Sequence, residues 1–250
     1  MHSHTTYPLK KALVLLIIFM MGCISLLPAN VFVIFYATHK GKTGHTGIAI
    51  DRYDIYVYDR VQNNELYSVN DTQSTGNLVY FDLWPKSDAF IRKHLKRDLE
   101  PSYYRLPRTS GDAPITISSL LSKGIPHKEG QPVDGLVEIE TCPYQDFQLI
   151  TYLQEVADAE KCFNAQLFNC TDFVCKGLTI ITGKKFSAKE RVLFSRFSTP
   201  NRLFRNLEHS KQLETHILKH PGEQMQGSFL AQRIVPELKT RIRKKITIQL

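Results

Sequence analysis

A cysteine at position 170 lies where the sequence predicts the first turn of a helix, in the stretch FNCTDFVCKGL. Asn169 is a preferred N-cap residue, and the charge of Asp172, three positions later, suits the positive end of the helix dipole. A thiol in the first turn of a helix has a lowered pKa, and the backbone N–H groups there can bind a developing oxyanion. These residues therefore predict a nucleophile that attacks a carbonyl group.

Cys170 has two other interpretations: half of a disulfide with Cys142 or Cys162, or a small apolar residue in a core. Cys175 is five positions further on, about 140° around a helix of 3.6 residues per turn. The two cysteines of this helix therefore cannot face the same site, and only Cys170 is placed for chemistry.

A nucleophilic cysteine needs a base, and His45 is the best candidate among the nine histidines. It opens the predicted strand HTGIAID, on which Gly47 and Ala49 share its face. These two residues leave the face nearly bare, so we expect a helix terminus to pack close to it. A turn histidine hydrogen-bonded to backbone is the competing interpretation, and spacing alone favours it.

The segments TGHTGIAID and FNCTDFV, in this order, resemble motifs of the circularly permuted papain-like superfamily. That superfamily includes permuted NlpC-type peptidases and the lecithin:retinol acyltransferase relatives. His45 matches its strand motif, and Asn169, Cys170 and Phe173 match its cysteine motif. The resemblance implies an α+β fold, with an antiparallel sheet packed against helices, and a Cys-His pair that cleaves an amide or ester through a thioester intermediate.

The same resemblance implies a polar partner for the histidine on the next strand. If the turn DRYD (51–54) closes a hairpin, residue 46 pairs with 59 or slips by one, and Asp59 or Tyr58 comes beside His45. Asp59 is the better partner, because a carboxylate orients the imidazole and stabilises the imidazolium. Asp71 is a substitute from the strand after. A surface carboxylate at a strand end is the competing interpretation of Asp59.

The N-terminus carries a targeting pattern. Lys10 and Lys11 precede the apolar run ALVLLIIFMMGCISLLP, which ends at Pro28. A basic flank before such a run is typical of a secretory signal, here residues 1–29 with cleavage after Ala29. An uncleaved membrane anchor is the alternative. In both cases we expect the rest of the chain to be exported, periplasmic or secreted.

Neither a metal nor a cofactor is expected. Four cysteines follow the signal, too few for a scaffold held together by disulfides. No CxxC pair occurs, and no His/Cys cluster has the spacing of a zinc site. The core must therefore hold itself together by packing.

We expect residues 30–183 to form one papain-like core. Its strands are expected at 30–38, 45–51, 55–61, 65–71, 77–85, 102–107 and 135–141, with the turn TQSTG between the fourth and fifth. Helices are expected at 86–100, within 108–134 as one short helix, at 143–160, and from Asn169 to Gly183. On the 143–160 helix the expected apolar stripe is Phe147, Ile150, Leu153 and Ala157.

Residues 184–250 hold 15 Lys or Arg against five Glu and no Asp, so the basic surplus is confined to the C-terminal part. Such a surplus can attract an anionic surface. No nucleic-acid-binding module accompanies it, and we expect no nucleic acid partner. This basic C-terminal extension is expected to be helical over 198–218, with Ser198 or Thr199 as the cap and Pro200 in the first turn.

The leading hypothesis is an exported cysteine-dependent hydrolase, an amidase or peptidase, with cell-wall peptides as the substrate that the resemblance implies for exported bacterial relatives. One alternative keeps the fold without the chemistry, as an exported binding or structural protein. Another is an acyltransferase or lipid-ester hydrolase of the same superfamily, because nothing in these residues selects a peptide over a lipid ester.

Overall fold

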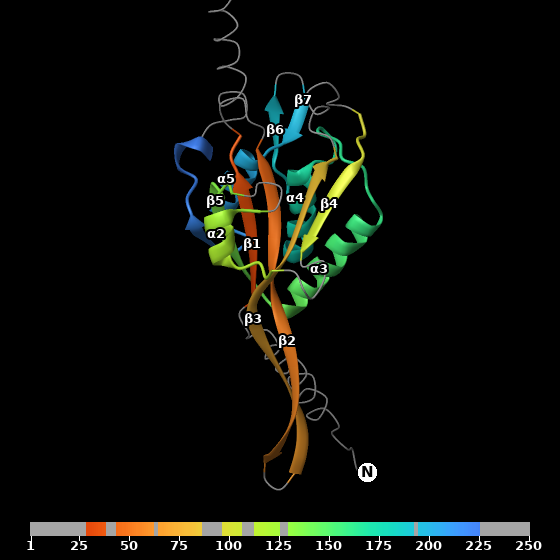
Figure 1. Cartoon of the computed structure of the whole chain (residues 1–250), viewed down its shortest axis with the longest axis vertical. Helices are drawn as coiled ribbons and strands as arrows, with labels where there is room; N and C mark the ends of the chain where they lie inside the picture. Colours follow the sequence, from red (N-terminus) through yellow and green to blue (C-terminus); the bar gives the residue numbers. More distant parts are fainter. Residues whose placement is uncertain are drawn as a thin grey trace, which may run out of the picture.

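The computed structural model describes residues 29–38, 44–62, 65–86, 97–106, 113–125, 130–192 and 195–225. These residues form eight strands, four α-helices and one short 3-10 helix, which confirms the α+β class. Figure 1 shows the sheet running through the middle of the molecule with helices beside it. In chain order the elements are β1 (Ala29–Tyr36), β2 (His45–Gln62), β3 (Glu65–Pro85), β4 (Pro101–Leu106), α2 (Ile117–Lys123), β5 (Gly135–Thr141), α3 (Pro143–Asp158), α4 (Cys170–Thr182), β6 (Lys189–Val192), β7 (Ser195–Ser198), α5 (Pro200–Glu208), β8 (Thr215–Lys219) and η3 (Gly222–Met225).

Two predicted elements fall outside this part of the chain. The signal sequence, up to Pro28, and nearly all of the helix expected at 86–100 lie outside the described residues. Among the helices that are described, none combines the length and the apolar character needed to cross a membrane.

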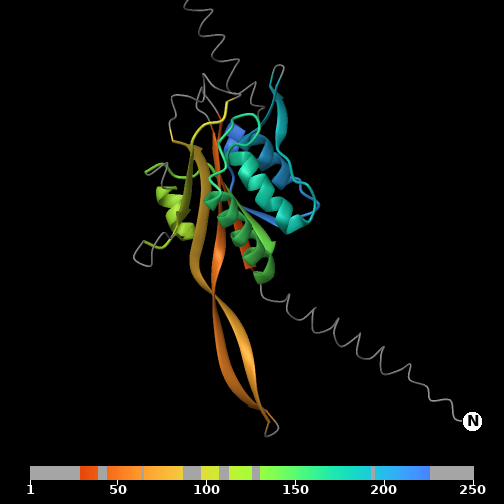
Figure 2. The same cartoon turned by 90° about the vertical axis from the view of Figure 1, so that its right-hand side faces the viewer.

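The main sheet has six strands in the order β4-β3-β2-β1-β5-β8, and every neighbouring pair is antiparallel. β1 is buried on both faces, as its run of β-branched and aromatic residues favours. Val31 and Phe35 point into a core shared with α3 and α4, while Phe32 and Ile34 point into a second core shared with α2. Figure 2 shows α2 on one side of the sheet and α3 and α4 on the other.

Strands β2 and β3 are longer than predicted and continue past the rest of the sheet as a two-stranded ribbon (Figure 1). The turns predicted at 51–54 and 72–76 are therefore wrong. The two polar segments lie opposite each other across the ladder, with Tyr53 paired to Ser74 and a bulge between Asp51 and Tyr53. These segments are polar because the ribbon leaves the hydrophobic core at this point. A polar segment between two apolar ones is also the pattern of a turn, so the sequence does not distinguish the two.

Helices α3 and α4 begin where the sequence predicts. Pro143 occupies the first turn of α3, and Gly183 ends α4 in a left-handed conformation with φ of 63°. The predicted apolar stripe of α3 is only partly correct. Leu149 and Leu153 are buried, whereas Phe147 is 67 % exposed. The helix is therefore rotated relative to the expected stripe, so that Leu149 rather than Phe147 packs against α4.

The same rotation buries Asp146, whose carboxyl group accepts a hydrogen bond from the hydroxyl of Thr141 at 2.6 Å. Burial raises the pKa of Asp146 to about 7, and the charge of Asp51 acts in the same direction, against the effect of the Thr141 hydrogen bond. Because this pKa lies above the ordinary value near 4, the protonated carboxyl stabilises the fold at low pH. That contribution is lost as the pH rises through about 7.

We therefore expect Asp146→Asn, which mimics the protonated form, to increase the free energy of unfolding more at pH 8 than at pH 5. Urea denaturation at the two pH values measures the difference. Asp158→Asn, at an exposed position of the same helix, is the matched control and should change little at either pH. A gain from Asp146→Asn that is equal at both pH values would contradict the assignment.

The chain beyond residue 183 contributes to the same core. α5 begins at Pro200 with Thr199 as its N-cap, as predicted, and buries Leu203, Phe204 and Leu207. The segment after α5 was expected to be helical but forms β8, the edge strand next to β5. Its spacing is compatible with a helix, and pairing with β5 decides the outcome.

Candidate active site

The first turn of α4 is held in place by its own cap and by the chain that follows it. The Asn169 side-chain oxygen accepts hydrogen bonds from the N–H groups of Thr171 (2.9 Å) and Asp172 (3.1 Å), and Asp172 in turn accepts from the Asn169 N–H at 3.2 Å. The Asn169 amide also donates to the Ser198 carbonyl at 3.0 Å. These contacts make Cys170 the first residue of the helix, as predicted.

Lys189, at the start of β6, adds a salt bridge to Asp172 with an Nζ–Oδ1 distance of 3.0 Å. The hydroxyl of Ser198 donates to the same carboxylate. β6 and β7 therefore brace the end of the helix that carries Cys170.

The thiol of Cys170 interacts with both His45 and Thr46 at the start of β2. Burial alone raises the pKa of Cys170, but the charge of His45 and hydrogen bonds from His45 and from the backbone and side chain of Thr46 outweigh it, so the pKa is lowered. The Thr46 hydroxyl also lies 3.4 Å from that of Thr171. The first turn of α4 and the start of β2 are therefore in contact beside the sulfur of Cys170.

His45 is fully buried, and its Nε2 lies 3.1 Å from Oδ2 of Asp82. Burial lowers the pKa of His45, but the charge of Cys170 and the hydrogen bonds to Asp82 and Cys170 raise it to about 9. With Nε2 directed to Asp82, Nδ1 is the ring nitrogen that can exchange a proton with the sulfur. Each group therefore favours the charged form of the other, the thiolate of Cys170 and the imidazolium of His45.

Asp82 comes from β3, where it is paired across the ladder with Gly47. Its Oδ2 also accepts a hydrogen bond from the hydroxyl of the buried Tyr80. Burial and the nearby Asp82 carboxylate hold the pKa of Tyr80 well above its ordinary value, so Tyr80 stays a donor. The ring of Trp84 also contacts the imidazole of His45, with the two rings perpendicular and their centroids 4.8 Å apart.

The structure does not bring Asp59 beside His45. β2 has no turn at 51–54, and Asp59 is instead paired with Ser68 on the ribbon. It lies 14 positions along the strand from His45, on the order of 45 Å at 3.3 Å per residue. The substitutes Tyr58 and Asp71 are on the ribbon too, paired with Val69 and Tyr56.

Asp82, the residue that takes this place, was not predicted. One feature of the sequence could have identified Asp82: it is an acidic residue within the mostly apolar strand NLVYFDLWP. A carboxylate buried there without a partner is costly, so a partner had to be expected. Only the pairing of β2 with β3 shows that Asp82 reaches His45.

Gly47 has a different role from the expected one. A Cβ atom at Gly47 would lie 2.5 Å from the hydroxyl oxygen of Tyr80, so this glycine makes room for Tyr80 and not for a helix. α4 packs on the opposite face of β2, where a Cβ at Gly177 would lie 3.7 Å from Ile48 Cδ1. The helix reaches His45 around the end of the strand.

We therefore expect Gly47→Ala to destabilise the protein by about 1–3 kcal/mol, because it must push the fully buried Tyr80 away from Asp82. Urea denaturation measures the loss. Gly135→Ala is the matched control: its Cβ would meet Pro221 at 3.3 Å, a contact that a small shift relieves, and its cost should be smaller. Equal stability of Gly47→Ala and wild type would show that Tyr80 is not held in this position.

The four cysteines that the structure describes are all free thiols, so Cys170 does not form the disulfide considered as an alternative. Cys175 is buried as well, but its burial and the charge of Asp172 raise its pKa. The pKa values of the two thiols of α4 are therefore shifted in opposite directions, and only that of Cys170 is lowered. The residue is only 5 % exposed.

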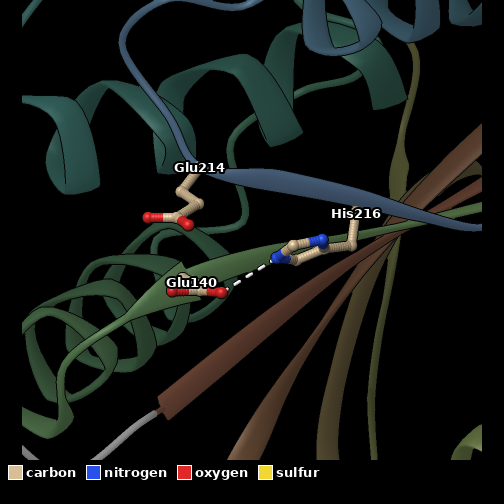
Figure 3. Close-up of side chains that lie close together, drawn as sticks. All are labelled: Glu140, Glu214 and His216. Carbon is tan, nitrogen blue, oxygen red and sulfur yellow. Dashed lines mark hydrogen bonds and ion pairs between the residues drawn. The ribbon is translucent and has the colours of Figure 1, made fainter.

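One group of side chains in the described part of the chain has ligand atoms close enough to hold a metal ion. Glu140, Glu214 and His216 bring them within 4.8 Å of one another, at the β5–β8 edge of the sheet (Figure 3). His216 Nε2 lies 2.8 Å from Glu140, whose hydrogen bond raises the pKa of His216. All three side chains are exposed, and an ion pair on the surface accounts for their arrangement.

Comparison of the chain with models of protein families, with curated proteins and with solved structures found no match.

Proposed function

We propose that the protein is an exported cysteine-dependent hydrolase, an amidase or peptidase of the circularly permuted papain-like type. The observation that carries this proposal is the buried arrangement of Cys170, His45 and Asp82. In it the thiol pKa is lowered and the imidazole pKa is raised to about 9. A Cys–His pair with an orienting carboxylate is the arrangement that activates a thiol for nucleophilic attack.

In the proposed reaction the Cys170 thiolate attacks the carbonyl carbon of an amide or ester, and the carbonyl electrons move to the oxygen. The N–H groups of Thr171 and Asp172 are bound to Asn169, which leaves the N–H of Cys170 as the first-turn donor for the oxyanion. The imidazolium of His45 gives its proton to the leaving amine or alcohol as the tetrahedral intermediate collapses to a thioester.

In the second half of the reaction neutral His45 takes a proton from water, the resulting hydroxide attacks the thioester, and the acid product leaves. The thiolate and the imidazolium are restored. Asp82 stabilises the imidazolium throughout, and Tyr80 holds Asp82 in position. Nothing in Cys170, His45 and Asp82 selects a peptide over a lipid ester, so cell-wall peptides and acyl esters are both substrates to be tested.

A second candidate is an exported binding protein that keeps the fold without catalysis. The burial of the site favours it, because His45 and Asp82 are 0 % exposed and Cys170 only 5 %. The two candidates differ in whether a small electrophile reaches an ionised sulfur.

Iodoacetamide labelling of the folded protein at pH 6, followed by peptide mass mapping, separates the two candidates. For the hydrolase, Cys170 is alkylated faster than the exposed Cys162, and denaturation abolishes the difference. If Cys162 reacts and Cys170 does not until the protein unfolds, the site is closed and the hydrolase proposal fails.

A further inference from the structure

The end of the sheet where the chain enters the fold is also where α3 begins. Ala29, the first residue of β1, is 0 % exposed and is paired with Thr141, the last residue of β5. Pro143, two residues after Thr141, starts α3. The apolar run that ends at Pro28 is therefore joined directly, without a linker, to a buried strand next to the first turn of α3.

Two aromatic side chains are exposed at this place. Tyr144 is 65 % exposed and Phe147 is 67 % exposed, and since they are three positions apart they share one face of α3. From Pro143 to Gln154 the only charged side chain is Asp146, and it is buried. Exposed charges come only in the last turns of the helix. The outer surface of the first three turns thus carries two aromatic rings and no charge, with Gln148 as an exposed polar side chain beside Tyr144.

We propose that the apolar run 12–28 is retained as a membrane anchor and that Tyr144 and Phe147 lie in the interfacial layer of the bilayer beside it. A run of 17 apolar residues is at the lower end of the length that crosses a bilayer's hydrocarbon core. Lys10 and Lys11 would then lie on the far side, as basic residues that flank an anchor do. With no linker, the domain has to rest on the membrane surface.

Aromatic residues are the side chains that proteins place in the interfacial layer, because their rings are partly apolar and tolerate the polar headgroups. Each ring buried against lipid recovers the free energy of removing apolar surface from water. The exposure of the pair and the entry point of the chain are independent observations that lead to the same surface.

The β2–β3 ribbon constrains the orientation. It leaves the body of the sheet at this same end, because β2 runs antiparallel to β1 and continues past Ala29 (Figure 1). A two-stranded ribbon has unpaired backbone groups along both edges and cannot enter hydrocarbon. The domain therefore lies with the ribbon along the bilayer surface, which lets the side of α3 contact the headgroups. His45 is at the other end of β1, paired with Tyr36 and about 23 Å along the strand from Ala29.

The proposal can be tested with the full chain in vesicles of dioleoylphosphatidylcholine, with and without the dibrominated analogue, whose bromine atoms quench nearby tryptophans. Trp84 is the only tryptophan and lies beside His45, so wild-type emission should be unaffected by the brominated lipid. Phe147→Trp adds a fluorophore at the proposed contact, and its added emission should fall by half or more. Leu167→Trp is the matched control: Leu167 is 72 % exposed but precedes α4, at the other end of the sheet, and its emission should not change.

Equal quenching of the two variants, or no quenching of Phe147→Trp, would overturn the proposed surface. The intact mass of the vesicle-bound protein tests the anchor separately: residues 1–28 should be present, and a chain that begins at Asn30 would overturn the proposal. Neither measurement depends on the chemistry of Cys170, so the outcome is independent of the proposed hydrolase.

Discussion

Cys170→Ala is expected to abolish hydrolysis of amide and ester substrates while the protein remains folded. Without the sulfur no thioester can form, and His45 and Asp82 have no nucleophile to assist. The loss should exceed about 1000-fold in kcat/KM, because the triad acts as a unit and only substrate binding and the oxyanion donor remain. Steady-state assays with a panel of peptide amides and acyl esters measure the effect.

Cys175→Ala is the matched control, since it makes the same change on the same helix at another buried thiol. The pKa of the Cys175 thiol is raised, not lowered, so this thiol is not expected to act in catalysis. Cys175→Ala should therefore leave kcat/KM within about twofold of wild type. Circular dichroism and urea denaturation check that both variants fold. Substantial turnover by folded Cys170→Ala would show that the nucleophile has been assigned to the wrong residue.

Asp82→Asn is expected to reduce kcat/KM by about 100-fold or more, because it removes the charge that stabilises the imidazolium of His45. The pH dependence should change as well. In the wild type, activity requires ionised Cys170 and protonated His45, so it falls as the pH rises through about 9 and also below the lowered pKa of Cys170. In Asp82→Asn the pKa of His45 falls and that of Cys170 rises. The pH range over which the enzyme is active therefore narrows at both its acidic and its alkaline end.

Asp59→Asn makes the same substitution on the ribbon, at a residue paired with Ser68. We expect its kcat/KM and pH profile to match the wild type. If Asp59→Asn lost as much activity as Asp82→Asn, the effect of Asp82→Asn could not be assigned to the direct contact of the Asp82 carboxylate with His45. If Asp82→Asn lost activity without a shift of the alkaline limb of its pH–activity profile, the role of Asp82 would be structural only.

The parts of the protein that could be predicted from the sequence depend on neighbours within one turn or one strand. The start of α4 follows from Asn169 and Asp172, whose hydrogen bonds are made within the helix itself. The end of the same helix follows from Gly183, which adopts the left-handed conformation that other residues avoid. Burial of β1 follows from its apolar run.

Predictions that needed the register between elements failed. Phe147 has the spacing of a core residue on α3, but the packing of α3 against α4 chooses Leu149 and leaves Phe147 in solvent. The polar residues around Tyr53 resemble a turn, but the ladder with Ser74 continues through them. In each case a local pattern was compatible with two arrangements, and contacts made far along the chain selected one.

The candidate site shows the same division. The sequence by itself determined that Cys170 opens a helix and that His45 opens a strand, because capping and strand residues act over a few positions. Only the tertiary structure decided that Asp82, and not Asp59, meets His45, because the carboxylate is supplied by the pairing of β2 with β3. A one-residue slip turns every side chain of a strand to the other face, so no property of Asp82 alone could reveal its partner.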